Sequence, residues 1–232
     1  MKILALESSA IAASVALTRD GILLAETTVN IGNTHSETLL PIVENMMKQT
    51  GLSVADADLF AVSVGPGSFT GVRIGVATVK GLAFGSGKPC VGVSTLEALA
   101  ENLSVVSDAL ICPVMNARRN QVYTALFRGG KRLMPDSAIS AEELDEILAA
   151  YDEPVLFTGD GYDLITGQTS HRFLPVPERL RVQSAASVAA VARRCYAEGR
   201  FTTDAGLVPV YLRPSQAERT RAQMLNNQSP KG

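Results

Sequence analysis

The chain carries the same order of apolar runs and turn signals twice. Near its start, strand-like runs at residues 3–6 and 14–17 are joined by a small-residue turn, and a hairpin signal follows at Asp20-Gly21. The pattern returns in the second half, where apolar runs at residues 110–115 and 121–127 flank a polar turn. The two copies share their layout rather than their residues. Because helical and strand-like segments follow each copy, the sequence predicts an α/β protein of two related halves.

This duplicated layout resembles that of the actin, sugar-kinase and Hsp70 group. The resemblance implies a two-lobed fold with halves of the βββαβα type. We expect the first lobe to span residues 1–103 and the second to span residues 104–213. A helix at residues 185–198 is expected to pack back on the first half. The remaining residues, 214–232, are polar and are expected to fray.

The composition excludes several classes of protein. With 46% hydrophobic and 19% charged residues, the chain can bury a core and is not disordered throughout. A formal net charge of −2 argues against a chain that binds a polyanion such as a nucleic acid by itself. Cys90, Cys112 and Cys195 lie apart in apolar surroundings, which favours buried reduced thiols. The N-terminal apolar run meets an acid at Glu7, and no stretch approaches the ~20 apolar residues of a membrane span, so we expect a cytoplasmic protein.

A glycine-rich loop follows a strand-like run at residues 59–64. The glycines between Gly65 and Gly71 permit tight turns, and the loop opens a helix whose free N–H groups could hold an anion. The alternative is that a strand-to-helix connection simply needs these glycines. The run GPGSFTG does not match GxxxxGK[ST], and no lysine stands where a P-loop requires one. The spacing therefore favours a simple connection.

The helix after this loop carries small residues at helical spacing. Gly71 and Gly75 are four residues apart, as are Ala77, Gly81 and Gly85. Each glycine in a soluble helix costs ~1 kcal/mol relative to alanine, so a close-packing reason is expected. The small residues could be buried within the fold or covered by a partner helix. The spacing does not separate these alternatives.

Few residues are arranged for catalysis or metal binding. His35 and His171 are far apart in sequence, and neither has a second histidine four residues on, which argues against a His-rich metal site. Ser68 lacks the GxSxG frame of an activated serine. Basic residues are concentrated in the second half, where solvated faces are favoured over an RNA-facing patch because aromatic residues do not alternate with them.

The first hairpin turn is the candidate for a segment that faces a nucleotide. In actin-like enzymes this turn faces the phosphates, with one acid there and another in the second half. Here the turn carries Glu7, Ser8 and Ser9, and Asn116 occupies the second position. One carboxylate and one neutral amide make a poor magnesium site. These four residues are therefore expected to be a vestigial nucleotide-facing set.

Five stretches resemble the TsaB (YeaZ) family. They are GPGSFTGVRIG at 65–75, KGLA at 80–83, GVSTLEAL at 92–99, HSE with LLP at 35–41, and PVYLR at 209–213. The match runs over nearly the whole chain, and its specific part is the first half. Glu7 and Asn116 depart from the aspartates that are usual at these positions, which places nucleotide binding further in doubt.

The resemblance implies a subunit without catalytic activity. The family is similar to TsaD, the catalytic subunit of the same pathway, whose His-x-x-x-His run binds a metal. The matching positions here are Thr95 and Leu99, so the ligand pair is missing. We expect no metal or cofactor on this chain alone, with ATP or ADP only at the level of the complex. That complex, which TsaE joins, moves threonylcarbamoyl from its adenylate to N6 of the adenosine just 3′ of the anticodon, so tRNA would be met only through the complex.

The resemblance also implies a partner-binding face on the helices at residues 34–50 and 71–85. TsaD would bind there, and a homodimer through the same face is the alternative state. Met46 and Met47 are expected to be exposed, since methionine is common on adaptable binding surfaces. The residues expected at this interface are Leu39, Leu40, Val43, Met46, Met47, Gly71, Val72, Arg73, Gly75, Val76, Val79, Gly81 and Ala83.

Two other functions remain as alternatives. An actin-fold ATP-dependent kinase or ATPase would need paired acids in the two halves, and Asn116 weakens that prediction. A metallopeptidase-like hydrolase would need a metal and a hydrolytic constellation, for which the sequence offers no residues.

Overall fold

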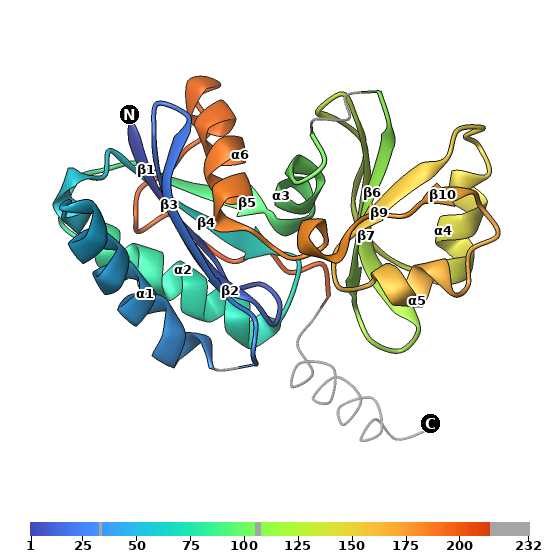
Figure 1. Cartoon of the computed structure of the whole chain (residues 1–232), viewed down its shortest axis with the longest axis horizontal. Coiled ribbons are helices and arrows are strands. Elements are labelled where there is room, and N and C mark those ends of the chain that lie inside the picture. The colour runs from blue at the N-terminus through green and yellow to red at the C-terminus, as the bar shows by residue number, and fades with distance from the viewer. Residues whose placement is uncertain (33, 105–107, 214–232) are drawn as a thin grey trace, which may run out of the picture.

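The computed structural model describes residues 1–32, 34–104 and 108–213, which form two lobes, each built on a five-stranded mixed sheet (Figure 1). In the first sheet the order is β3-β2-β1-β4-β5. The first three strands pair antiparallel, whereas β4 and β5 continue parallel to β1. The elements of this half are β1 (Lys2–Glu7), β2 (Ala13–Arg19), β3 (Ile22–Val29), α1 (His35–Thr50), η1 (Val54–Asp56), β4 (Leu59–Gly65), α2 (Phe69–Ala83), β5 (Cys90–Ser94) and α3 (Thr95–Glu101).

The second half repeats this topology. Its sheet has the order β8-β7-β6-β9-β10, which matches the first sheet strand for strand. The duplicated layout predicted from the sequence is therefore confirmed, although the sequence analysis gave no residue ranges for β8, α5 and β10. The elements are β6 (Leu110–Asn116), β7 (Gln121–Arg128), β8 (Lys131–Ser140), α4 (Ala141–Leu148), β9 (Val155–Thr158), α5 (Tyr162–Thr166), β10 (Phe173–Leu174), η2 (Glu178–Leu180) and α6 (Ala185–Ala197).

The strand β1 is buried on both of its faces. Leu4 and Leu6 pack in one core cluster with α1 and α2, whereas Ile3 and Ala5 pack in another with α6. Because successive side chains of a strand point to opposite faces, one continuous apolar run serves both clusters. The first sheet is thus covered by α1 and α2 on one side and by α6 on the other (Figure 1).

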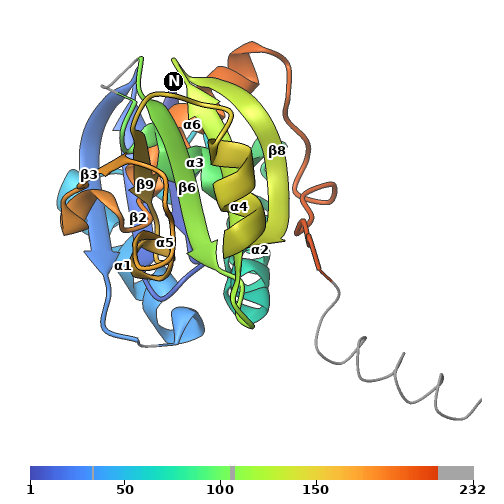
Figure 2. The ribbon, with the colours of Figure 1, turned by 90° about the vertical axis from the view of Figure 1, so that its right-hand side faces the viewer.

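Two helices cross the boundary between the halves. Leu96 and Leu99 of α3 pack into the core of the second sheet, while Val188 and Val191 of α6 pack on the first sheet. The helix α6 therefore packs back on the first half as expected, and a division of the chain at residue 103 does not follow the packing. Figure 2 shows α4 and α5 on the outer face of the second sheet.

The helix α1 buries more of its length than the sequence suggested. Met46 and Met47 are only 2% and 8% exposed, and they pack in the core of the first lobe with Leu39 and Val43. The expectation that the methionine pair is exposed is therefore wrong. Four apolar residues at helical spacing serve the protein's own core, and the opposite face of α1 is left to solvent.

The tail that was expected to fray, residues 214–232, lies outside the described residues. Over the part of the chain that the structure describes, no helix is both long and apolar enough to cross a membrane.

All three cysteines are free and buried, as predicted. Burial raises the pKa of the Cys112 thiol to about 12 and that of Cys90 to about 11, and it also raises the pKa of Cys195. Since the thiolate is the reactive form, we expect negligible reaction with Ellman's reagent in the native protein and rapid reaction of three thiols in urea. Fast labelling of Cys112 under native conditions would contradict this structure.

Candidate functional site

The turn between β1 and β2 packs closely against the small residues at the start of α2. A Cβ atom at Gly71 would lie 2.1 Å from the backbone oxygen of Ser8, and one at Gly75 would lie 2.3 Å from the Ser8 hydroxyl. That hydroxyl also donates a hydrogen bond of 2.9 Å to the carbonyl of Gly71. Gly81, by contrast, has no atom within 4 Å of its Cβ position. The first part of the glycine stripe is therefore internal packing, and only its far end is open.

Glu7 is held below the turn and away from the space between the lobes. Its carboxylate accepts a hydrogen bond of 2.6 Å from the backbone N–H of Ser9 and another from the hydroxyl of Ser63. The side chain is 1% exposed. Burial raises the pKa of Glu7 although both hydrogen bonds oppose the rise. Neither Glu7 nor Ser8, two of the four residues predicted to face a nucleotide, lines the cleft described below.

The buried acid predicts a particular dependence of stability on pH. Because its pKa is raised on folding, the folded protein binds a proton more readily than the unfolded chain. The associated stability is present below the ordinary carboxyl pKa and is lost as the pH rises through the raised value. The variant Glu7→Gln cannot ionise, so its free energy of unfolding relative to wild type should improve between pH 5 and pH 8 by roughly 1 kcal/mol or more.

Urea unfolding at both pH values measures this difference, and Glu44→Gln on the solvent side of α1 is the matched control. If the difference in free energy of unfolding between wild type and Glu7→Gln is the same at both pH values, Glu7 stays ionised in the folded protein.

A cleft of about 600 Å³ separates the two lobes. Its walls are the β1–β2 turn, the glycine-rich loop, the β6–β7 turn and the C-terminal strap, a name used here for residues 202–213. Ser9 and Asn116, two of the four predicted nucleotide-facing residues, do line this cleft. The lining residues are Ser9, Ala10, Ile11, Pro66, Gly67, Ser68, Phe69, Thr70, Met115, Asn116, Ala117, Arg118, Tyr123, Asp160, Val210, Tyr211, Leu212 and Arg213.

Asp160 supplies the cleft with a carboxylate that the sequence analysis missed. Its Oδ1 atom accepts a hydrogen bond of 3.3 Å from the backbone N–H of Asn116. Loss of hydration in the cleft wall raises the pKa of Asp160, and the hydrogen bond opposes that rise. Its position after β9, between two glycines, matches the place of the glycine-rich loop after β4, and this correspondence was the signal that could have found it.

The C-terminal strap joins the two walls of the cleft. The backbone N–H of Val210 donates to the carbonyl of Val64 at 2.7 Å, and the ring of Tyr211 stacks on Phe69 with centroids 4.6 Å apart. Arg73 donates to the Tyr211 hydroxyl at 2.8 Å. Arg213 then reaches the second lobe, where its guanidinium donates to the carbonyl of Ala117 at 3.0 Å. The strap thus connects α2 with the β6–β7 turn, a role that its sequence did not reveal.

Most residues predicted at the partner interface are buried in the first lobe. The buried members are Leu39, Val43, Met46, Met47, Gly71, Val72, Gly75, Val76, Val79 and Ala83. These residues cannot present side chains to a partner without unfolding, so this part of the prediction is corrected. Leu40, Arg73 and Gly81 are exposed. The same two helices also expose Ala77, and Phe84 at the end of α2 is 81% exposed.

The two positions that the resemblance matches to metal ligands of the catalytic relative, Thr95 and Leu99, lie in the interior. Thr95 is fully buried with no hydrogen-bond partner for its hydroxyl, and Leu99 packs in the core of the second sheet. The two histidines make hydrogen bonds to backbone carbonyls instead. The Nε2 atom of His35 lies 2.7 Å from the carbonyl oxygen of Ala10, and the Nε2 atom of His171 lies 3.0 Å from that of Glu153. Among residues 1–32, 34–104 and 108–213, no three side chains of His, Cys, Asp or Glu come together as a metal site would require.

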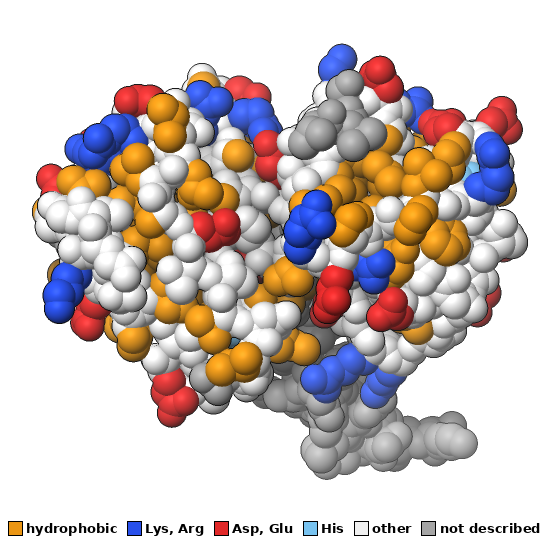
Figure 3. All heavy atoms as spheres, in the orientation of Figure 1, with side chains coloured by type: hydrophobic (Ala, Val, Ile, Leu, Met, Phe, Trp, Pro, Cys, Tyr) orange, Lys and Arg blue, Asp and Glu red, His pale blue; other side chains and the backbone are white. Residues whose placement is uncertain are grey.

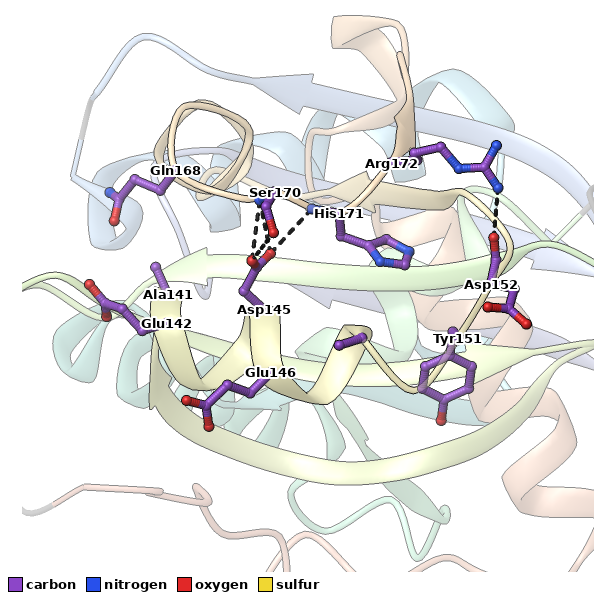
Figure 4. A pocket seen from close by; sticks show the side chains of 11 residues that line it. Ala141, Glu142, Asp145, Glu146, Tyr151, Asp152, Gln168, Ser170, His171 and Arg172 are labelled. Carbon is purple, nitrogen blue, oxygen red and sulfur yellow. Dashed lines mark hydrogen bonds between the residues drawn. The ribbon is translucent and has the colours of Figure 1, made fainter.

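A second hollow, of about 790 Å³, lies beside α4 in the second lobe (Figure 4). Asp145 points toward its wall and accepts hydrogen bonds from the backbone N–H and hydroxyl of Ser170, at 3.1 and 2.6 Å. Burial tends to raise the pKa of Asp145, but these hydrogen bonds leave it lowered. The carboxylate therefore anchors the loop before β10, which is a structural role.

Comparison with known proteins gives one consistent result at the level of sequence. A family model described as "TsaD: tRNA N6-adenosine threonylcarbamoyltransferase" matches residues 25–166. The chain is 33% identical to the tRNA threonylcarbamoyladenosine biosynthesis protein TsaB of Bacillus subtilis, with 94% of this chain and 96% of that protein aligned. It is 31% identical to the protein of the same name from Escherichia coli, with 94% and 96% covered.

Comparison with solved structures agrees with the comparison of sequences. YeaZ from Pseudomonas aeruginosa superposes with a TM-score of 0.78 at 27% identity, covering 91% of this chain and 99% of the other. A polyphosphate/ATP-glucomannokinase from Arthrobacter superposes with a TM-score of 0.51 at 9% identity, covering 83% and 99% of the two chains. Such low identity shows the fold alone. The predicted two-lobed fold of the sugar-kinase group is thereby confirmed.

Proposed function

The chain belongs to the TsaB (YeaZ) family, and from this we infer that it acts in the biosynthesis of threonylcarbamoyladenosine in tRNA. We propose a non-catalytic subunit, in the cytoplasm, that pairs with TsaD. TsaD carries out the transfer of threonylcarbamoyl to N6 of the adenosine, and TsaE joins the assembly. tRNA is brought to this chain by the complex.

The observation that carries this proposal is the interior placement of Thr95 and Leu99. Both positions match metal ligands in TsaD, but leucine has no donor atom, and its side chain fills the core of the second sheet. Thr95 is fully buried at the start of α3. A metal site at this place would need both side chains replaced and the core opened. The chain therefore supports the transfer reaction through binding rather than chemistry.

The solvent side of α1 and α2 is the proposed site of pairing. It exposes Leu40 and Phe84, and it includes the open position at Gly81. The TsaD family model spans both helices, since it matches residues 25–166. A TsaD subunit should therefore carry an equivalent pair of helices, and two such faces can pack about an approximate twofold axis. A homodimer would use the same face and would compete with TsaD for it.

A kinase or ATPase would need carboxylates on both walls of the cleft. Glu7 is buried beneath its turn, and among the described residues that line the cleft Asp160 is the single acid. One carboxylate with a neutral Asn116 is a weak magnesium site. We therefore propose that this chain binds no nucleotide alone and that ATP or ADP acts at the level of the complex.

Co-purification of the full chain with TsaD of the same organism tests the proposal, followed by a threonylcarbamoyl-transfer assay with and without this chain. We expect a stable pair, loss of modification when the chain is omitted, and no transfer by the chain alone. Transfer or ATP turnover by the isolated chain would overturn the non-catalytic assignment. Failure to pair with TsaD would overturn the subunit assignment.

A further inference from the structure

The mouth of the interlobe cleft carries an excess of positive charge, although the formal net charge of the chain is −2. Arg118 and Arg213 line the cleft, and Arg119 follows on the same turn. Asp160 is the one acid among the described lining residues. Figure 3 shows Lys and Arg side chains together at the lower end of the boundary between the lobes. A local basic excess on a nearly neutral chain suits an anionic partner.

Among the residues that the structure describes, five other arginines of the second half have carboxylate partners. The pairs are Arg128–Glu153, Arg132–Glu97, Arg132–Asp136, Arg181–Asp163, Arg194–Glu101 and Arg200–Glu198. Within the described ranges, Arg118 and Arg119 form no ion pair, and both are exposed. Their charge is available to a ligand, whereas the charge of the paired arginines is partly offset by the neighbouring carboxylates.

The β6–β7 turn holds these two arginines in a defined conformation. Arg118, Arg119 and Asn120 have φ angles of 62°, 54° and 57°, a conformation that costs L-residues free energy. The side chain of Asn116 accepts a hydrogen bond of 2.8 Å from the backbone N–H of Arg118, and Gln168 donates to Asn120 at 3.2 Å. The backbone of the turn is therefore fixed from both sides, so Arg118 at the cleft wall and Arg119 beside it can meet a ligand with little further loss of backbone entropy.

The opposite wall offers hydrogen-bond donors and an aromatic surface. The hydroxyl of Ser9 is buried without a partner, and the first turn of α2 leaves the N–H groups of Phe69 and Thr70 without helical acceptors. Tyr211 is 41% exposed while its ring stacks on Phe69. Donors suit phosphate oxygens, and an exposed ring supported from behind suits a stacked base.

We propose that this cleft mouth binds a single-stranded segment of RNA. The phosphates contact Arg118 and Arg119 on one wall, and an unpaired base stacks on Tyr211 on the other. This combination of guanidinium groups and one aromatic platform is how proteins bind unpaired RNA, whose bases are free to leave the stack. The inference rests on the proposed function, since that function brings tRNA to the complex, and it assigns a direct RNA contact to this chain.

Fluorescence anisotropy with a labelled RNA hairpin tests the inference, on the full chain alone and on its complex with TsaD. A fully paired RNA duplex of equal length and ADP serve as comparisons. We expect the double variant Arg118→Ala/Arg119→Ala to bind the hairpin about tenfold more weakly or worse. The slope of log affinity against log salt should fall by about 1.4 in magnitude, because each phosphate contact to a single strand contributes about 0.7.

Tyr211→Ala should weaken hairpin binding severalfold with less effect on the salt slope, and Tyr211→Phe should retain it because the ring remains. Arg19→Ala/Arg179→Ala is the matched control, since it removes two exposed arginines that do not line the cleft. This control should bind hairpin as wild type does.

Several results would overturn the inference. Unchanged affinity in Arg118→Ala/Arg119→Ala would do so, as would equal binding of hairpin and duplex, or no hairpin binding by either form of the protein. Displacement of the hairpin by ADP would point to a nucleotide pocket instead, and weaker TsaD pairing with unchanged RNA affinity would point to a protein contact. Because pairing is measured separately, a chain that binds TsaD but no RNA would refute this inference and leave the proposed function standing.

Discussion

Replacing Gly71 by alanine should lower the free energy of unfolding by about 2–4 kcal/mol. The added Cβ atom would lie 2.1 Å from the backbone oxygen of Ser8 and 3.1 Å from the imidazole of His35. A backbone atom at that distance cannot rotate away, so the β1–β2 turn or α2 must shift. Either movement also breaks the 2.9 Å hydrogen bond between the Ser8 hydroxyl and the Gly71 carbonyl.

The same replacement at Gly81, on the same helix, should have the opposite sign. No atom lies within 4 Å of the Cβ position there, so alanine adds no clash. Alanine is the better helix former by ~1 kcal/mol, and Gly81→Ala should therefore stabilise the protein by about 0.5–1 kcal/mol. Urea unfolding of the two variants beside wild type measures both effects. If both variants shift stability in the same direction, the packing described for α2 is wrong.

The sequence predicted the fold well because the signals for the fold are local. Hairpin glycines, apolar runs and helical spacing recur in the same order in both halves, and each depends on residues close together in the chain. The residue ranges of β8, α5 and β10 were nevertheless not predicted. The edge strand β8 shows little burial, and α5 and β10 span only Tyr162–Thr166 and Phe173–Leu174, too short for a pattern to emerge.

The site was predicted less well because it depends on contacts between distant segments. The spacing of small residues along α2 could not reveal whether Ser8 or a partner helix covers Gly71 and Gly75. The resemblance predicts Met46 and Met47 at a binding surface, and the spacing of α1 alone does not show which of its faces meets the sheet. Tyr211 pairs with Arg73 across 138 positions, and nothing local to either residue signals that pair.

The cleft lacks the exposed acid on its first turn that the two-lobed kinase-like fold suggests. Glu7 occupies the acid position of the first turn, but hydrogen bonds from Ser9 and Ser63 hold its carboxylate in the interior. The C-terminal strap fills part of the space between the lobes and connects them through Arg213. A cleft joined across its mouth by its own chain opens less freely than the cleft of a kinase, which must admit and release its nucleotide. This arrangement favours a rigid binding subunit.

The variant Leu40→Arg should weaken binding to TsaD by about 100-fold, which corresponds to about 2.7 kcal/mol. Leu40 is 45% exposed on the solvent side of α1, within the proposed pairing face. A charged side chain there would have to be desolvated in a helix-to-helix contact, and its bulk would separate the two faces. Because Leu40 makes little contribution to the core, the variant should unfold at nearly the same urea concentration as wild type.

Leu133→Arg is the matched control, since Leu133 is also 45% exposed but lies on β8 of the second lobe. This control should bind TsaD normally in isothermal titration calorimetry. Gly81→Arg supplies a second test, because the open position accepts a side chain without internal clash. Normal affinity in both Leu40→Arg and Gly81→Arg would exclude the α1–α2 face as the pairing surface. Loss of affinity in these two variants alone, with homodimerisation weakened in parallel, would mean that TsaD and a second copy of this chain compete for one face.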